Sequence, residues 1–210
     1  PYFASVVIGG NFLIYGGDEA LKHGLLPKLV EGKLKMAFAY AEKQSRFDLH
    51  DVEFKAEKSG DDYVLSGEKG VVFHAASADK IVVSARTSGG SRDEKGITVF
   101  LVDAGVDGLS RRDYPTVDGL RASELHFDGV VAEAVLGEVD NGLPLIERVV
   151  QHGIAAISAE EVAALEAAMA EEKAAAAEAG QRDEPLVSLP MTKDLSLIPI
   201  SEPTSLGKIS

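Results

Sequence analysis

This 210-residue chain contains no cysteine. The residue types that could support catalysis or ligand binding are its histidines, its carboxylates and its paired glycines. Without cysteine there is no disulfide, iron–sulfur cluster, thiolate zinc site or cysteine nucleophile. The histidines lie singly and form no His-Glu-x-x-His pattern, so we interpret them as structural or surface residues and predict no metal site. They are His23, His50, His74, His126 and His152.

Paired glycines and paired acidic residues are equally weak signs of a site. No nucleophile elbow, P-loop or GxGxxG fingerprint occurs in the sequence. We interpret Gly9-Gly10 and Gly16-Gly17 as turns or points of close helix packing. Asp61-Asp62 is interpreted as loop sequence rather than a cation site. Residue types and spacing alone therefore assign no catalytic residue.

The composition is that of an ordinary globular chain with an acidic surface. Hydrophobic residues make up 45% of the sequence, and 21 basic against 34 acidic residues leave a net charge of −13. This balance argues against binding to a phosphate backbone, so nucleic acid is not an expected partner. Residues 1–17 hold too few apolar residues for a membrane helix, and no membrane partner is expected. The absence of cysteine fits a cytoplasmic protein. A chain that starts at Pro1 without Met is expected to be a fragment.

Two patterns divide the first 137 residues. Residues 1–32 are typical of helix, with Leu21, Leu25 and Leu29 at helical spacing and Pro27 expected to interrupt or end the helix. Residues 33–137 carry short β-type runs separated by Gly and Asp, with no helical stretch between them. The runs are 52–56, 63–65, 70–73, 81–84, 97–102 and 124–127. Such closely spaced short strands predict an antiparallel barrel or sandwich.

A long helix is expected within residues 138–180. Asn141 can cap it, Pro144 suits its first turn, and an Ala- and Glu-rich sequence continues to about Ala179. Six glutamates between residues 156 and 180 indicate a solvated face. Residues 181–210 show neither period, and we predict a tail that is disordered or derived from adapter sequence.

Five sequence elements, in one order between Tyr2 and Leu165, resemble the acyl-CoA dehydrogenase superfamily. They are Leu25–Lys33 (LLPKLVEGK), Met36–Glu42 (MAFAYAE), Asp62–Lys69 (DYVLSGEK), Gly96–Val102 (GITVFLV) and Gly119–Leu125 (GLRASEL). In addition, 40–52 and 111–121 are similar to the branch known as the pimeloyl-CoA dehydrogenase small subunit. Five elements in order are more specific than any one motif.

The resemblance implies an α+β fold in three parts. Residues 1–32 correspond to the end of an N-terminal helical domain, 33–137 to an antiparallel β-barrel-like middle domain, and 138–180 to the first helix of a C-terminal helical bundle. The implied reaction is α,β-dehydrogenation of an acyl-CoA, in which a carboxylate removes the α-proton and the β-hydrogen leaves as hydride to FAD. Implied partners are the acyl-CoA substrate, an electron-transfer flavoprotein and a further dehydrogenase subunit in a homo- or hetero-oligomer. The branch implies a dicarboxylyl-CoA such as pimeloyl-CoA.

The family holds the flavin ring with two segments of its middle domain. Carried over by motif, the cofactor-binding residues are Phe38, Tyr40, Ala41, Val71, Val72 and Phe73. Three of them depart from the family pattern, because Ala41 and Phe73 replace threonines and Val71 replaces an aromatic residue. Backbone groups make part of such contacts, so these changes are tolerable. Without the resemblance, both segments would be interpreted as core strands.

Arg46 and Phe47 are the candidate substrate-binding residues. Phe47 stands where the family has a substrate-contacting serine. Arg46 suits bidentate pairing with the distal carboxylate of a dicarboxylyl-CoA. The alternative for Arg46 is a salt bridge to Asp48 or Glu42.

No catalytic base is assigned, because the family's glutamate lies in the C-terminal bundle and Glu160, Glu161 and Glu166 are poorly placed for that role. Two other functions stay open: a non-catalytic structural small subunit of a heteromeric acyl-CoA dehydrogenase, and an oxidase-like relative that passes electrons to oxygen. We also expect an apolar face of the first bundle helix to be exposed and to drive oligomerisation. Its residues are Leu145, Ile146, Val149, Val150, Ile154 and Ile157.

Overall fold

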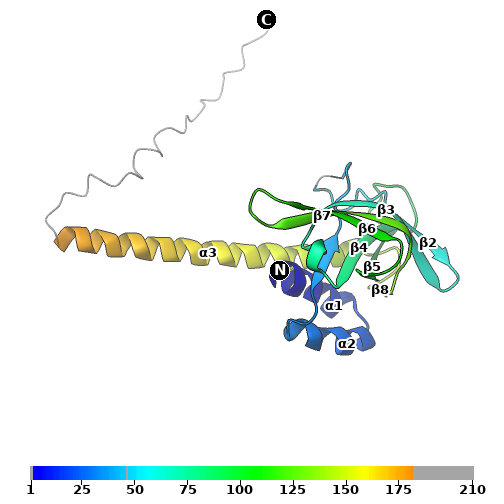
Figure 1. Cartoon of the computed structure of the whole chain (residues 1–210), viewed down its shortest axis with the longest axis horizontal. Coiled ribbons are helices and arrows are strands. Elements are labelled where there is room, and N and C mark those ends of the chain that lie inside the picture. Colours follow the sequence, from blue (N-terminus) through cyan, green and yellow to red (C-terminus); the bar gives the residue numbers. More distant parts are fainter. Residues whose placement is uncertain (1, 46, 182–210) are drawn as a thin grey trace, which may run out of the picture. The chain divides into compact units, whose positions relative to one another are not determined.

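The computed structural model describes residues 2–45 and 47–181 of the chain, with side chains described up to residue 177 (Figure 1). The chain divides into two compact units, Pro1–Ser158 and Ala159–Ser210. The first unit holds the described strands and the N-terminal helices, and the second holds the last part of the C-terminal helix. Apart from residue 181, the predicted tail lies outside the described residues.

The predicted N-terminal helical segment is confirmed as three consecutive helices. They are the π-helical η1 (Phe3–Gly9), α1 (Gly10–Gly16) and α2 (Glu19–Val30). Asp18 caps α2 by accepting a hydrogen bond from the Leu21 N–H at 2.7 Å. Pro27 lies inside α2, so the expectation that it interrupts or ends the helix is wrong. Proline removes one N–H, and the carbonyl four residues earlier belongs to the exposed His23, where solvent can replace the lost partner.

The first glycine of each pair allows close packing, as expected. A Cβ on Gly9 would lie 2.6 Å from the Cβ of Met36, and a Cβ on Gly16 would lie 2.7 Å from a methyl group of Leu145. Cβ atoms do not approach other carbons so closely, so these two positions need glycine. They let η1 pack on the first strand and α1 on the start of the C-terminal helix.

One sheet of eight strands forms the centre of the first unit. Its order is β6-β7-β3-β2-β4-β5-β8, with β1 beside β4. The strands are β1 (Met36–Ala39), β2 (Lys55–Ser59), β3 (Asp62–Phe73), β4 (Lys80–Arg86), β5 (Ile97–Asp103), β6 (Leu109–Pro115), β7 (Arg121–Val131) and β8 (Ala134–Leu136). Neighbours are antiparallel except β1 with β4 and a single parallel pair, Lys55 with Arg86, between β2 and β4.

The predicted strand runs are largely confirmed, and three strands were missed, one of which, β8, has only three residues. Runs 63–65 and 70–73 both belong to β3, which is longer than either suggested. Val52 and Phe54 are buried, as their alternation indicated, but they precede β2. The strand β6 was missed because its central residues, 110–113, are exposed and charged or polar, so it carries no apolar alternation. The strand β1 was missed because four residues are too few to show a period.

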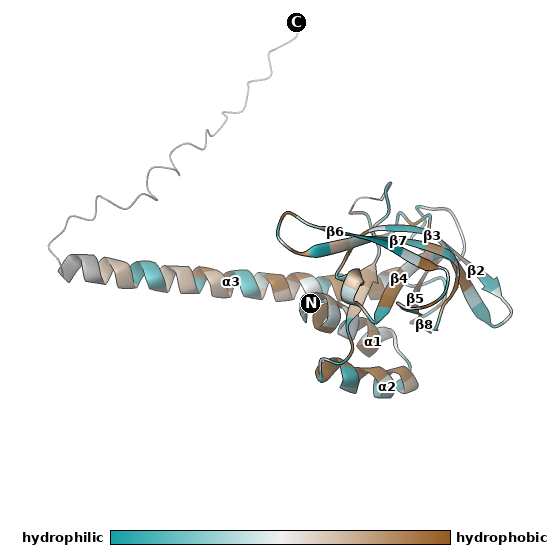
Figure 2. Cartoon of the chain, viewed as in Figure 1, coloured by the Kyte–Doolittle hydropathy of each residue, from teal (hydrophilic) through white to brown (hydrophobic). Residues whose placement is uncertain are grey.

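The hydrophobic core lies around β4 and β5, which are buried on both faces. From Ile81 to Arg86 and from Ile97 to Val102 every residue is buried. Figure 2 shows the resulting hydrophobic colouring of β4, and of helix α1 beside the sheet. Strands covered on both sides read as continuous apolar runs rather than as alternating patterns.

The predicted long helix is confirmed as α3 (Leu143–Gln181). In the first unit, Ile146 and Val149 are fully buried, so the expectation of an exposed apolar face is wrong for these two residues, because they pack into the core. Ile154 and Ile157 are exposed. In the second unit hydrophilic and hydrophobic residues alternate along the helix (Figure 2). The predicted solvated glutamates are exposed, namely Glu160, Glu161, Glu166, Glu171 and Glu172.

Phe100 provides a test of this core assignment. It is fully buried on β5, with its ring centroid 5.1 Å from that of Tyr63. Phe100→Ala should lower the free energy of unfolding by about 3–5 kcal/mol, because it leaves a cavity in a close-packed interior. The exposed Val117 is the control, and Val117→Ala should change this energy by less than about 0.5 kcal/mol. Urea denaturation followed by circular dichroism measures both, and equal losses would contradict the assignment.

Candidate functional site

The candidate site lies where the end of β1 meets the end of β3. These strands are not neighbours in the sheet, since β1 pairs with β4 and β3 pairs with β7. Two hydrogen bonds nevertheless join them: the Gly70 N–H donates to the Ala41 carbonyl at 2.8 Å, and Lys69 Nζ donates to the Tyr40 carbonyl at 3.2 Å. The structure therefore brings together the two segments that the sequence assigned to cofactor binding.

The side chains of the two segments divide between surface and core. Val71 is 49% exposed and Phe73 is 42% exposed, whereas Val72 is buried in the core. Phe38, Tyr40 and Ala41 are half-buried. The Phe38 ring packs 4.6 Å from that of Phe12 and 5.3 Å from that of Tyr40, measured between centroids. A ligand bound to this surface would contact apolar side chains. It could contact Val72 only at the backbone of that residue.

An irregularity in β3 determines which side chains reach the surface. Lys69 pairs with Leu125 and Val72 pairs with Ser123, so three steps along β3 match two along β7. The extra residue is a β-bulge. Val71 lies in it with a φ of 49°, in the left-handed region. This conformation costs a β-branched residue about 1–2 kcal/mol, so the surrounding contacts have to maintain it.

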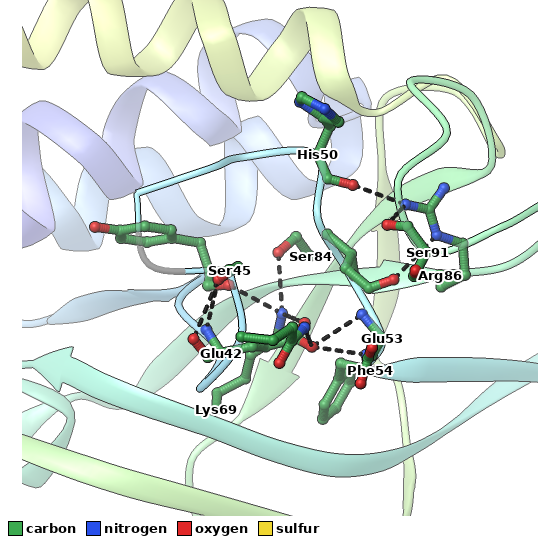
Figure 3. Close-up of polar contacts among 12 residues, drawn as sticks. Glu42, Ser45, His50, Glu53, Phe54, Lys69, Ser84, Arg86 and Ser91 are labelled. Atoms are coloured by element: carbon green, nitrogen blue, oxygen red, sulfur yellow. Dashed lines mark hydrogen bonds and ion pairs between the residues drawn. The ribbon is translucent and has the colours of Figure 1, made fainter.

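A buried ion pair lies directly beneath this bulge. Lys69 Nζ is 2.7 Å from Glu42 Oε1, and the two side chains are 0% and 5% exposed (Figure 3). The ammonium group also donates to Ser84 Oγ at 3.3 Å, and with the Tyr40 carbonyl it has three acceptors for its three protons. The Phe54 ring centroid lies 5.0 Å away. The charge of Lys69 is thus fully matched inside the core.

The second oxygen of Glu42 holds a neighbouring loop. Glu42 Oε2 accepts hydrogen bonds from the backbone N–H groups of Glu53 at 2.9 Å and Phe54 at 3.1 Å, and from Gln44 Nε2 at 2.8 Å. Ser45 Oγ accepts from the Glu42 N–H at 3.0 Å. Figure 3 shows the bonds from Glu53 and Phe54 meeting at the carboxylate. One side chain therefore connects β1, β3 and the segment that leads into β2.

Burial of this ion pair lowers the pKa of Lys69, because a charged ammonium group is less stable away from water. Removal from water lowers the pKa of Lys69 from 10.5 to about 8, against the opposing influence of the Glu42 charge and hydrogen bond. The charged form is still the main one at neutral pH.

Arg86 fixes the adjacent loops by a different arrangement. It is buried, and its guanidinium donates to five backbone carbonyls at 2.7–3.2 Å (Figure 3). These carbonyls belong to His50, Val52, Ser91, Asp93 and Lys95. The segments 50–54 and 91–95 thus keep a defined path although neither forms a strand.

The two candidate substrate-binding residues are placed differently. Phe47 is 90% exposed, beside the loop that Glu42 and Ser45 stabilise. Arg46 lies outside the described residues, so its pairing with a substrate carboxylate and its alternative salt bridge both stay predictions. Asp48, one proposed partner, contacts His50 Nδ1 at 2.7 Å.

A cavity of about 660 Å³ opens beside the bulge. Ala41 and Val71 lie on its wall together with charged residues from the strands β3, β6 and β7 and from the segment between β1 and β2. Two ion pairs lie there, Lys43 with Glu68 and Arg112 with Glu124, each at 2.8 Å. Sequence reasoning did not single out these charged residues, because they come together only through the pairing of β3, β6 and β7.

In the described part of the chain no cluster of three or more His, Asp or Glu side chains is placed to hold a metal ion. Nor does any helix in that part combine the length and apolar character that crossing a membrane requires.

Residues 37–130 match the family model for the acyl-CoA dehydrogenase middle domain. Numerous curated sequences and solved structures of acyl-CoA dehydrogenases also match this chain. Residues 37–130 therefore form an acyl-CoA dehydrogenase middle domain. The matched segment lies inside the predicted middle domain 33–137 and contains both predicted cofactor-binding segments together with Glu42, Lys69 and Arg86.

Three relatives illustrate the similarity to acyl-CoA dehydrogenases. The mitochondrial isovaleryl-CoA dehydrogenase of Pongo abelii is 34% identical over 139 residues, which cover 63% of this chain and 33% of that protein. The (2S)-methylsuccinyl-CoA dehydrogenase of Cereibacter sphaeroides is 31% identical over 147 residues, covering 63% and 27%. The solved steroid ACAD Tcur3481-Tcur3483 superimposes with a TM-score of 0.70 and 28% identity, covering 86% of this chain and 47% of its own. The chain thus spans less than half of each relative.

The buried Lys69 should leave a signature in the pH dependence of stability. Between pH 8 and 10.5 the unfolded chain holds a proton on Lys69 that the folded chain has lost, so the contribution of this group to the free energy of unfolding rises with pH. Below pH 8 its unfavourable contribution is present in full. We therefore expect the wild type to gain stability relative to the double variant Glu42→Gln/Lys69→Met as pH rises from 7 to 10.5. Other titrating groups are common to both chains and cancel.

Urea denaturation at a series of pH values measures this difference. A difference that stays flat, or that moves in favour of the double variant with rising pH, would show that the pKa of Lys69 is not lowered in the folded chain.

Proposed function

We propose that this chain forms the flavin-facing part of an FAD-dependent acyl-CoA dehydrogenase, with Phe38, Tyr40, Ala41, Val71, Val72 and Phe73 against the flavin ring. The observation that carries the proposal is the hydrogen-bonded junction between Ala41 and Gly70, which sets both segments side by side. The match of residues 37–130 to the acyl-CoA dehydrogenase middle domain supports it, because acyl-CoA dehydrogenation is the activity named in the relatives. When bound there, FAD would supply the acceptor for the hydride.

The residues present fit one face of a flavin ring. The ring system is flat and largely apolar with polar edges, and the exposed sides of Val71 and Phe73 offer an apolar surface beside the half-buried Tyr40. Ala41 and Phe73 carry no hydroxyl, so hydrogen bonds to the ring edge have to come from backbone groups. In this proposal the chain orients the ring and excludes water from it.

For the substrate we propose a dicarboxylyl-CoA, with pimeloyl-CoA as one candidate. The relative that is a (2S)-methylsuccinyl-CoA dehydrogenase supports this class, since methylsuccinyl is itself a dicarboxylic acyl group. Arg46 would bind the distal carboxylate and Phe47 would contact the acyl chain. We further propose an electron-transfer flavoprotein as electron acceptor and a cytoplasmic location. No residue is proposed as the catalytic base.

A non-catalytic subunit of a heteromeric dehydrogenase is the alternative function. Two observations favour it. Ala41, Val71 and Phe73 depart from the family pattern. The solved ChsE4-ChsE5 complex of Mycobacterium tuberculosis, 26% identical with a TM-score of 0.64, has two different components. In either function the chain would associate with a further dehydrogenase subunit. Flavin binding separates the two, since only the first requires it on these segments.

Val71 and Val131 make a matched pair for testing the flavin surface. They are 49% and 48% exposed, and Val131 pairs with Val64, which is seven residues and about 23 Å from Val71 along β3. Val71→Asp should raise the dissociation constant for FAD at least tenfold, because the ring would cover an unpaired carboxylate. Aspartate tolerates the left-handed backbone of residue 71, so the change adds no strain there.

The test is titration of the purified chain with FAD, followed by quenching of flavin fluorescence. Val131→Asp should leave the dissociation constant within a factor of two. Equal dissociation constants for FAD in the two variants would show that the flavin does not bind at this surface. Failure of the wild-type chain to retain FAD, with its circular dichroism spectrum intact, would favour the non-catalytic alternative.

A further inference from the structure

We infer that Lys69 and Glu42 are positioning residues of the proposed flavin site: their ion pair maintains the bulge that turns Val71 and Phe73 outward. This inference rests on the proposed function for its link to flavin, but its structural part can be tested without any cofactor. The two residues act through the backbone of Tyr40 and Gly70 rather than by touching a ligand, since both are almost fully buried.

The alternation of side chains along β3 is the first step. Leu65 and Lys69 are both buried, an even number of residues apart, as alternation along a strand requires. The register shift between Leu65 and Gly67 does not disturb this alternation, because its extra residue lies on β7. Continued regularly, this alternation would bury residues 71 and 73 and expose residue 72. The structure has the reverse, with Val72 buried and Val71 and Phe73 exposed. The extra residue between Lys69 and Val72 causes the reversal.

Hydrogen bonds from outside β3 maintain the bulge. The backbone of Val71 is strained, with its φ of 49°, so the bulge would not persist on local preference alone. Two bonds reach it from outside the strand, and both end on β1 and the residues that follow it: Gly70 N–H to the Ala41 carbonyl, and Lys69 Nζ to the Tyr40 carbonyl. They flank the strained residue on its N-terminal side.

Glu42 supplies the third step, because it fixes the partner of these bonds. Its Oε1 holds Lys69 Nζ at 2.7 Å, and its Oε2 is held by the N–H groups of Glu53 and Phe54. Glu42 directly follows Ala41, so a carboxylate fixed at one end keeps the Tyr40 and Ala41 carbonyls facing β3. Figure 3 shows Lys69 and Glu42 at the centre of this set of contacts.

Amide hydrogen exchange, measured by NMR on the chain without cofactor, tests the structural part. In Glu42→Gln/Lys69→Met we expect exchange of the Gly70 N–H to accelerate at least tenfold, because its acceptor is no longer held in place. The amides of β4 and β5 should keep their protection. The Val71 carbon chemical shifts, which report φ, should move toward extended values. Unchanged Gly70 exchange together with unchanged Val71 shifts would overturn the inference.

Lys80→Met is the matched control, since it also removes a partly buried cation, but one whose carboxylate partners are Asp103 and Glu133 rather than Glu42. It should lower stability while leaving Gly70 exchange and FAD affinity unchanged. If both variants lose FAD affinity in proportion to their loss of stability, the ion pair has a merely structural role and the inference is wrong. If the double variant does not fold, the single variant Glu42→Gln takes its place in the test. It should show the same changes in Gly70 exchange and Val71 chemical shifts to a smaller extent.

FAD titration then links the ion pair to the proposed function. We expect the double variant to bind FAD at least tenfold more weakly than the wild type. A wild type that binds no FAD refutes the proposed function and leaves the exchange experiment to judge the bulge. A wild type and a double variant that bind FAD equally refute the positioning role and leave the proposed function intact.

Discussion

A charge pair inside an apolar core has to be matched atom for atom, because neither ion can turn to water there. In this protein that constraint falls on Lys69 and Glu42, and their matching determines the local fold. The acceptors of the ammonium group are the Tyr40 carbonyl just after β1, the Glu42 carboxylate and Ser84 on β4. The carboxylate takes its other donors from the loop before β2. No buried side-chain nitrogen or oxygen among the described residues lacks a partner. The ion pair is therefore stable only while the surrounding backbone keeps its path, and the pair in turn holds that backbone in place.

The segment between β1 and β2 is held by hydrogen bonds from side chains rather than by pairing with a strand. None of the described residues between 42 and 54 belongs to a strand, yet Glu42, Ser45 and Arg86 hold this segment by bonds to backbone groups. Arg86 can serve five carbonyls because its guanidinium is planar and carries five N–H donors in a fixed geometry. The loop that carries the candidate substrate residue Phe47 thus begins and ends at fixed points, with Phe47 itself exposed. A rigid scaffold that presents an exposed loop is a common way to place binding residues.

The proposed flavin surface differs in kind from a site built on polar side chains. Ala41, Val71 and Phe73 supply apolar contact only, so recognition of the polar edge of a ring falls to the backbone. Backbone recognition depends on where the strand ends lie rather than on which side chains they carry. This is why departures from the family pattern at these positions are compatible with retention of the fold, and why the geometry of the bulge matters more here than residue identity.

Local patterns in the sequence determined the helices and most strands, because amphipathic periods and motifs are properties of neighbouring residues. Only the tertiary structure decided the parallel pairing of β1 with β4, the edge strand β6 and the passage of α2 through Pro27. It also decided which of Val71, Val72 and Phe73 face outward, since alternation read from Lys69 gives the opposite answer. Lys69 would be taken from its type alone for a surface residue. Its burial follows from Glu42, 27 residues earlier, and a contact at that separation leaves no local signal in the sequence.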